Sequence, residues 1–410
     1  MPHAILPDTL WLRILIGMVL GIACAMMIDI PASIIPWIAL PGDLFMALLK
    51  MIIVPLVLSS VILGVASAGT LSSLKSMGAR LIPYFICTTA IAITIGITLT
   101  NLVQPGLMID ASTIAVEETT RATLENLTIP DRLLNMIPMN PAEAQLNKNM
   151  IQLVVLGVII GIALLTIKTK PARLAHDIFE FTQDACMMVV GWAMWIAPIA
   201  VFSLMVGAVS SMGASALIGI GYYMACVIGG LFGVFLLYLL IVTLIAKRNP
   251  LTFLKDIRAA QIIAFSTSSS AATLPVSLSV AEEKLKIDED VRGFTIPLGA
   301  TINMDGTALY QATAAIFLCQ VFGIDLAMGE TILLLLTTIG ASIGTPAMPG
   351  VGLIVLATIL TSIGVPAEGI GIILGVDRLL DMCRTTVNVT GDLTATAVMQ
   401  QWMHGRGKKE

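Results

Sequence analysis

The chain has 410 residues, of which 57% are hydrophobic and 12% are charged, and its formal net charge is −4. Soluble proteins carry about 25% charged residues, so this composition argues against a soluble multidomain protein and requires lipid to solvate much of the surface. The charge balance also argues against a nucleic-acid binder, which would present a basic face. The six cysteines lack C-x-x-C spacing and the three histidines lie outside the apolar runs. Neither a disulfide framework nor a zinc site is therefore predicted.

Eight apolar segments are long enough to cross about 30 Å of hydrocarbon. They span residues 10–29, 44–67, 81–103, 150–167, 180–208, 214–246, 293–322 and 369–399. The first segment has no clear small-residue cleavage site, which favours a transmembrane helix over a removed signal peptide. Basic residues follow every second segment, so the positive-inside rule predicts that both termini are cytoplasmic and that the loop at 104–149 lies outside.

Two further apolar stretches, 259–281 and 331–365, do not fit as single spans. The first has basic residues at both ends and the second has only acidic ones, so each is expected to enter and leave on the same side. Ten ordinary spans would put the basic residues at 284–292 outside. The sequence therefore predicts an all-α polytopic membrane protein with eight transmembrane helices and two re-entrant helical hairpins. Such hairpins, entering from opposite sides as inverted repeats, are typical of secondary transporters.

An acidic residue lies beside a glycine midway along the segment 293–322, in the run Asn303–Thr307. A carboxylate at mid-membrane is costly, so the pattern predicts an unwound helix in which Asp305, Asn303 and backbone carbonyls bind a cation. The alternative is a helix kinked at Gly306, with Asp305 paired to a buried base.

The last apolar segment carries a polar stripe. Its members recur at spacings of three and four residues, which keeps them on one helix face; they are Asp377, Asp381, Arg384, Asn388 and Asp392. Arg384 offers a fork suited to a carboxylate, and Asp381 can hold an ammonium group. Together they predict recognition of an acidic amino acid. The alternative is an internal salt bridge between Asp381 and Arg384 that only balances charge.

The serine cluster at 268–270 permits three readings: a helix-capping turn, a hydroxyl lining for substrate, or a nucleophile. A nucleophile needs an activating base, and no histidine lies inside a span. An intramembrane serine hydrolase is therefore only a remote alternative.

Four motifs in order resemble the dicarboxylate/amino acid:cation symporter family, which includes the archaeal sodium-aspartate symporters and the excitatory amino-acid transporters. They are Ser268-Ser269-Ser270 with Thr273-Leu274-Pro275, the run Gly299–Thr307, Ser342–Thr345 with Pro349-Gly350, and Asp381–Asp392. The resemblance covers essentially the whole chain.

The resemblance implies a homotrimer in a cell inner (plasma) membrane, working as an elevator in which a transport domain slides against a scaffold. The scaffold would comprise 1–80 (helices 1 and 2) and 104–208 (the outer loop and helices 4 and 5). The transport domain would comprise helix 3 (81–103), helix 6 (209–250) and a core at 251–410. In that core lie hairpin 1 (251–284), helix 7 (289–323), hairpin 2 (330–365) and helix 8 (368–402).

The same resemblance implies site residues. Substrate would contact the first hairpin tip, helix 7, the second tip and helix 8, at Ser268, Ser269, Ser270, Thr307, Met348, Pro349, Gly350, Val351, Gly352, Asp381, Arg384, Thr385 and Asn388. Sodium sites would use three sets of residues. These are Gly299, Asn303, Asn388 and Asp392; Thr301, Met304, Ser342, Ile343 and Thr345; and Thr88, Thr89, Asn303 and Asp305.

Some positions depart from the family pattern. Ser268 and Met382 stand where members place an extra arginine, and Phe85 stands where many have tyrosine. Gln311 replaces the proton-bearing glutamate of the animal glutamate transporters, which disfavours their proton mechanism. We therefore expect symport of Na⁺ with L-aspartate or L-glutamate. The alternative is a proton-coupled symporter of glutamate, aspartate or a C4-dicarboxylate.

Overall fold

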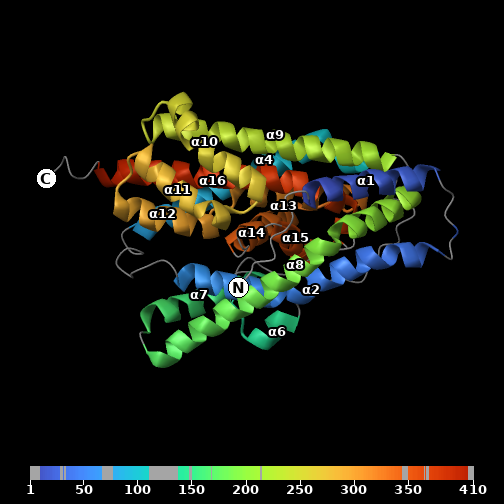
Figure 1. Ribbon diagram of the computed structural model, residues 1–410, viewed down its shortest axis with the longest axis horizontal. Coiled ribbons are helices and arrows are strands. Elements are labelled where there is room, and N and C mark those ends of the chain that lie inside the picture. The colour runs from blue at the N-terminus through green and yellow to red at the C-terminus, as the bar shows by residue number, and fades with distance from the viewer. Residues whose placement is uncertain are drawn as a thin grey trace.

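The computed structural model describes residues 10–27, 31, 34–66, 77–109, 137–146, 150–167, 169–212, 215–343, 350–363, 365 and 369–404. All regular secondary structure in these residues is helical, which confirms the all-α prediction. The helices lie roughly along one long axis and form an elongated bundle (Figure 1).

One group of helices packs around α8. Its members are α1 (Leu10–Met27), α2 (Ile35–Ala66), α7 (Met150–Thr166) and α8 (Lys170–Met212). Figure 1 shows α8 running obliquely across the molecule, where it contacts α1, α2 and α7. The approach of α1 to α8 requires a small residue. A Cβ on Gly21 would lie 2.6 Å from the carbonyl oxygen of Phe202, so only glycine permits this packing.

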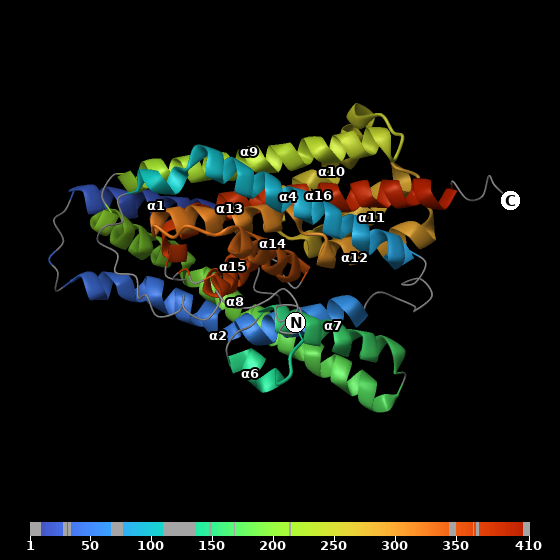
Figure 2. The same cartoon turned by 180° about the vertical axis from the view of Figure 1, so that it is seen from behind.

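A second group holds the helices that carry the predicted site. Its members are α4 (Ala79–Val103), α9 (Ser215–Leu244), α10 (Pro250–Thr267), α11 (Ser270–Glu283), α12 (Glu289–Ile302), α13 (Asp305–Val321), α14 (Met328–Ile343), α15 (Val351–Ser362) and α16 (Ile370–His404). Helix α4 lies across α13 on the face seen in Figure 2, and α9 packs on α16 and α13. Two short helices, η2 (Pro105–Met108) and α6 (Pro141–Leu146), lie in the connections.

The first predicted hairpin is a pair of contacting helices, α10 and α11. Asn249 caps α10 by accepting from the backbone N–H groups of Leu251 and Thr252. The turn comes at the serine cluster. Ser268 adopts φ = +53°, and the Ser269 hydroxyl accepts from the backbone N–H of Ala272 at 3.1 Å, which starts α11. The capping interpretation of the serines is therefore correct for Ser269.

The helix break predicted near Asp305 is also present. Helix α12 ends at Ile302, Asn303 and Met304 are not helical, and α13 starts at Asp305. In the second predicted hairpin, α14 and α15 contact each other, and Gly350 at φ = +79° precedes α15. The tip itself, 344–349, lies outside the described residues.

Two predicted segments are longer in the structure. We expected 44–67 and 180–208, whereas α2 begins at Ile35 and α8 extends from Lys170 to Met212. In α8, polar and charged residues at 170–184 continue the helix beyond the lipid-like stretch. In α2, the apolar residues before 44 are interrupted by Pro36, Pro41 and Gly42, which are signals for a helix break, although the helix runs through them.

Length and hydropathy alone identify few spans among the described residues. Ala79–Met108 and Leu217–Leu244 can cross a membrane, and the bent pair Lys170–Ala193 and Trp195–Gly207 is a third candidate. Helix α16 is long enough, but its charged stripe lowers its hydropathy. The count of eight spans and the re-entrant character of the hairpins remain predictions.

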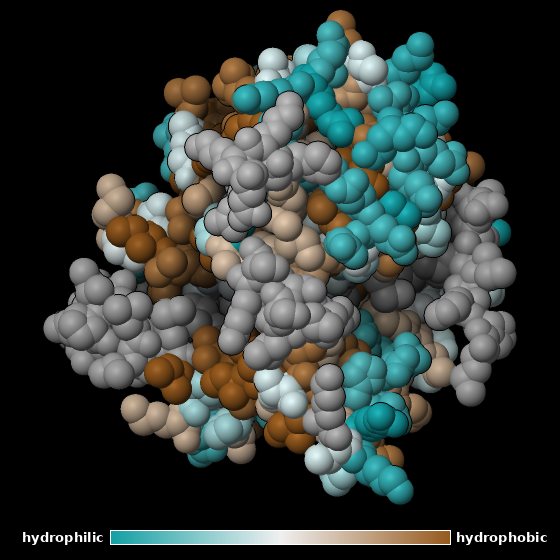
Figure 3. Space-filling view, turned by 90° about the vertical axis from the view of Figure 1, so that its left-hand side faces the viewer, coloured by the Kyte–Doolittle hydropathy of each residue, from teal (hydrophilic) through white to brown (hydrophobic). Residues whose placement is uncertain are grey.

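The basic connections lie at one end of the molecule. The α9–α10 connection, the α11–α12 connection and the C-terminal end of α16 are together there (Figure 1). Figure 3 views this end and shows hydrophilic residues gathered beside apolar ones. This grouping agrees with the charge pattern that suggested one cytoplasmic side; the orientation itself remains a prediction.

Candidate functional site

The polar stripe of α16 faces the interior of the protein. All five predicted members, Asp377, Asp381, Arg384, Asn388 and Asp392, are at most 5% exposed. The structure thus buries charged side chains that the spacing had placed on one helix face. Buried charges are costly unless they are paired or bind an ion, so their partners define the chemistry of the site.

Arg384 is held between two carboxylates, and we call Asp377, Asp381 and Arg384 the arginine cluster. The Nε of Arg384 donates to Asp381 Oδ1 at 2.9 Å, and the Nη1 of Arg384 donates to Asp377 Oδ1 at 3.2 Å. The guanidinium also lies over the ring of Tyr310, with Cζ 4.3 Å from the centroid. The internal salt bridge considered from the sequence therefore exists, but it is one part of a larger cluster.

The start of α15, beside the second hairpin tip, touches the arginine cluster. The backbone N–H of Gly350 donates to Asp381 Oδ2 at 2.9 Å. A Cβ on Gly352 would lie 2.7 Å from Arg384 Cζ, so glycine is needed for this close approach. Gln311 on α13 is fully buried and donates from Nε2 to the Gly352 carbonyl at 3.2 Å. Val351 is also fully buried, whereas Met348 and Pro349 lie outside the described residues.

Asn388 joins α16 to the start of α13. Its Oδ1 accepts from the backbone N–H of Gly306 at 2.8 Å, and its Nδ2 donates to Thr307 Oγ1 at 3.0 Å. Thr385 is buried one residue after Arg384. The structure therefore places Thr307 against Asn388, which lies one helical turn after Arg384 on the same buried face of α16.

The serine tip is buried as well. Ser268, Ser269 and Ser270 are at most 6% exposed, and Ser268 Oγ has no hydrogen-bond partner among the described residues. The first hairpin is fixed to α16 by Gln261, whose Nε2 donates to Thr390 Oγ1 at 3.0 Å.

Two other carboxylates lie next to the helix break, and we call Asp305 and Asp392 the carboxylate pair. Asp305 accepts from Thr89 Oγ1 at 2.6 Å and from the Tyr238 hydroxyl at 2.7 Å, and it is fully buried. No basic residue in the described part of the chain forms an ion pair with it. The alternative in which a buried base neutralises Asp305 is therefore wrong for the described residues.

Asp392 has a similar environment. Its Oδ1 accepts from Asn303 Nδ2 at 3.0 Å, while Asn303 Oδ1 has no hydrogen-bond partner among the described residues. A Cβ on Gly299 would lie 2.7 Å from Asp392 Oδ1, so glycine leaves room for the carboxylate. Carboxylates with only neutral donors, beside an unused amide oxygen, form an oxygen-rich site suited to a hard cation.

The other residues of the predicted sodium sites lie on several helices or at the helix break, and some lie partly or wholly outside the described residues. Thr88, Thr301 and Ser342 each donate to a carbonyl of their own helix, at Phe85, Pro297 and Ile339. Met304 is buried at the break, and Thr345 and the side chain of Ile343 lie outside the described residues. The structure thus connects Thr89 directly to Asp305 and Asn303 directly to Asp392.

Sequence reasoning missed three residues of the site: Tyr238, Tyr310 and Arg378. A tyrosine in an apolar helix is a usable signal, because a buried hydroxyl usually finds a hydrogen-bond partner. Arg378 lies next to Asp377 and three residues before Asp381, so it shares the helical spacing of the stripe, and Nη1 of its side chain is 3.8 Å from Asp381 Oδ2. The rule that flags any charge in a membrane helix would have found it.

Comparison with known proteins places these residues in a wider context. A family model described as the sodium:dicarboxylate symporter family matches residues 10–402. The chain is 36% identical to the proton/sodium-glutamate symport protein of Bacillus subtilis over 95% of this chain and 92% of that protein. It is 32% identical to the proton/glutamate-aspartate symporter of Escherichia coli, over 97% and 94%.

The human excitatory amino acid transporter 3 is 32% identical over 89% of this chain and 79% of that protein. All three relatives are named as symporters or transporters rather than enzymes. The serine hydrolase considered for the serine tip is therefore discarded.

Proposed function

We propose a substrate and a coupling ion for this chain, which belongs to the sodium:dicarboxylate symporter family and is a transporter rather than an enzyme. Its relatives are named for glutamate and aspartate symport. The proposal is that the chain imports L-aspartate or L-glutamate together with Na⁺, as a secondary active symporter.

The observation that carries the substrate is the arginine cluster. Arg384 can hold the side-chain carboxylate of the substrate through its planar fork, while Asp381 takes the ammonium group. A buried site of this kind favours an amino acid with a second carboxylate, because a neutral amino acid would leave Arg384 without that partner. Thr307, Thr385, Asn388, the serine tip and residues 348–352 complete the proposed binding site.

The carboxylate pair supports the coupling ion. Asp305 and Asp392 are buried with neutral donors only among the described residues, so a cation bound there would supply the missing positive charge. Of the three expected sodium sets, one contains Asp392 and another contains Asp305. Sodium binding would stabilise the α12–α13 break. Because Thr307 and Asn388 of the proposed substrate site lie next to this break, ion binding would favour substrate binding.

Gln311 favours sodium over protons. Its amide lies in full burial against the Gly352 carbonyl, and an amide does not take up a proton in the physiological range. Proton coupling remains the second candidate, because two of the relatives carry the word proton in their names.

The proposed mechanism is an elevator within a homotrimer. Helices α4 and α9–α16 would form the moving transport domain, and α1, α2, α7 and α8 would form the scaffold. The packing of α4 and α9 on α13 and α16 supports this division. The protein would lie in a cell inner membrane with both termini cytoplasmic.

Purified protein reconstituted in liposomes tests the proposal. Uptake of labelled aspartate is expected to require an inward sodium gradient and to be competed by glutamate more strongly than by succinate or serine. Uptake driven equally well by a proton gradient without sodium would overturn the coupling ion. Arg384→Cys is the variant for the substrate site, with the partly exposed Arg292→Cys as its matched control.

A further inference from the structure

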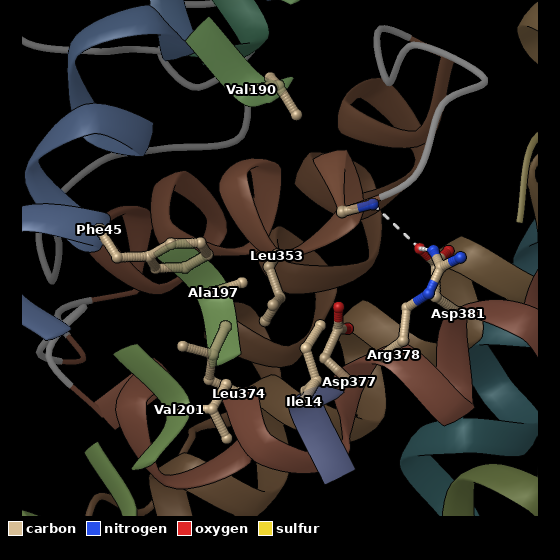
Figure 4. Close-up of a pocket in the computed structure, with 11 residues that line it drawn as sticks. Ile14, Phe45, Val190, Ala197, Val201, Leu353, Leu374, Asp377, Arg378 and Asp381 are labelled. Carbon is tan, nitrogen blue, oxygen red and sulfur yellow. Dashed lines mark hydrogen bonds and ion pairs between the residues drawn. The ribbon is translucent and has the colours of Figure 1, made fainter. Parts of the chain in front are cut away.

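Arg378 is a second arginine beside the proposed ammonium site. It lines a cavity between the two helix groups, with Ile14 and Phe45 on one side and Leu353 and Asp381 on the other. Figure 4 shows Arg378 next to Asp381 at the polar edge of this otherwise apolar cavity. The side chain of Arg378 is 15% exposed and that of Asp381 is 4% exposed, so the pair is poorly screened by solvent.

The contacts of Arg378 are incomplete. Its Nη1 lies 3.8 Å from Asp381 Oδ2, beyond hydrogen-bond distance, and neither Nε nor Nη1 has a hydrogen-bond partner among the described residues. Asp381 Oδ1 is already taken by Arg384, and Oδ2 also accepts from Gly350. Arg378 therefore adds positive charge on the Oδ2 side of Asp381 without occupying it through a direct hydrogen bond.

We infer that Arg378 is a positioning residue that makes binding depend less on an ammonium group in the substrate. Its guanidinium lies on the side of Asp381 opposite Arg384 and partly neutralises the Asp381 carboxylate. This inference rests on the proposed function, in which Asp381 receives the ammonium group. The two arginines and the two carboxylates of Asp377 and Asp381 together carry no net charge, so the site tolerates Asp381 without an ammonium group.

Arg378 is expected to affect ligands with and without an ammonium group differently. A substrate ammonium at Asp381 lies near the Arg378 guanidinium and is repelled by it. A dicarboxylate without an amine avoids this repulsion, and Arg378 then compensates Asp381, which would otherwise be a poorly paired buried charge. Arg378 therefore shifts the selectivity of the site from amino dicarboxylates toward amine-free dicarboxylates.

Binding measurements on the purified full-length protein test this inference. Labelled L-aspartate is displaced by succinate or by L-malate, which carries a hydroxyl in place of the ammonium. In Arg378→Met, the ratio of the L-malate Kd to the L-aspartate Kd is expected to rise about fivefold, equivalent to about 1 kcal/mol. Arg378→Lys keeps the charge and should restore most of the original ratio.

Arg292→Met is the matched control. The Arg292 side chain is 17% exposed and pairs with Glu282 at 3.2 Å, away from the site, so its loss should leave the ratio unchanged. An unchanged ratio in Arg378→Met, or no displacement by L-malate from the unsubstituted protein, overturns the inference. Failure of the proposed function is separate: it appears as aspartate binding that survives Arg384→Cys.

Discussion

The arginine cluster and the carboxylate pair are both buried on α16 and its neighbours, but they differ in charge. Asp377 and Asp381 are paired with Arg384 at 3.2 and 2.9 Å. Asp305 and Asp392 accept only from hydroxyl and amide donors among the described residues. With Arg378 beside Asp381, the first region has two arginines for its two carboxylates and is balanced, whereas the second carries negative charge that no described basic residue compensates.

This difference separates two kinds of recognition. A balanced set of fixed charges suits a zwitterion, because the ligand brings its own positive and negative groups to matching partners. An uncompensated pair of carboxylates suits a cation, because the ion removes the cost of burying negative charge. Breaking each region should therefore affect different ligands.

The largest effect is expected for Arg384→Cys. Truncating one partner of a buried, hydrogen-bonded charge pair between a protein and its ligand costs about 3 kcal/mol of binding free energy, so the Kd for aspartate should rise about a hundredfold or more. Sodium binding should be much less affected. Isothermal titration calorimetry measures both, and retained aspartate affinity would contradict the assignment of the arginine cluster to substrate. Arg292→Cys controls for loss of an arginine elsewhere.

The next effect concerns Asp305→Asn. A neutral amide cannot supply the several kcal/mol that a full charge gives a nearby cation, so the sodium concentration at half-saturation should rise about 30-fold or more. The sodium-free protein should melt no lower than the unsubstituted one, because an uncompensated charge has been removed. Sodium titration of aspartate binding provides the measurement, with the exposed Asp290→Asn as control. Unchanged sodium dependence would assign the ion elsewhere.

Tyr238→Phe tests a single hydrogen bond to the carboxylate pair. The variant removes the hydroxyl that donates to Asp305 Oδ2 at 2.7 Å, and a hydrogen bond to a charged group contributes about 1.5 kcal/mol or more. We expect the sodium-free protein to melt a few degrees lower, with sodium reducing the difference. Tyr222→Phe is the control on the same helix, where the side chain is 48% exposed. Equal melting temperatures for the two variants would refute the role of Tyr238.

Gly352→Ala has the smallest expected effect on binding. The new Cβ would lie 2.7 Å from Arg384 Cζ, and the guanidinium is held by two carboxylates, so it cannot move away freely. The Kd for aspartate should rise about tenfold, or about 1.4 kcal/mol. Gly340→Ala on α14 is the matched control, because nothing lies within 4 Å of its new Cβ. Equal binding by both variants would show that the close approach is not needed.

Prediction from sequence succeeded where contacts are local. The stripe on α16 follows from its spacing, and the pairing of Asp381 with Arg384 is an i,i+3 contact along one helix. The break before Asp305 and the capping of α11 by Ser269 also follow from short-range chemistry. The failures were long-range, since Tyr238 and Tyr310 acquire their roles from partners on other helices.

Arg378 illustrates the limit most clearly. Its charge is visible in the sequence, but its role depends on the cavity formed by α1, α2, α8 and α15 beside Asp381. The start of α8 was missed for a related reason, because a lipid-based pattern ends where a helix leaves the apolar region and not where its backbone hydrogen bonds end.

The scarcity of charge determined, from the sequence by itself, that the protein belongs in a membrane and that its few buried charges mark its site. The family, and the acidic substrate that we propose, followed from motifs within single helices and turns, where residue spacing fixes geometry. Only the tertiary structure decided which carboxylates are balanced and which are not. Thr89 and Asp305 are 216 residues apart in the chain, and only the packing of α4 against α13 brings their side chains together.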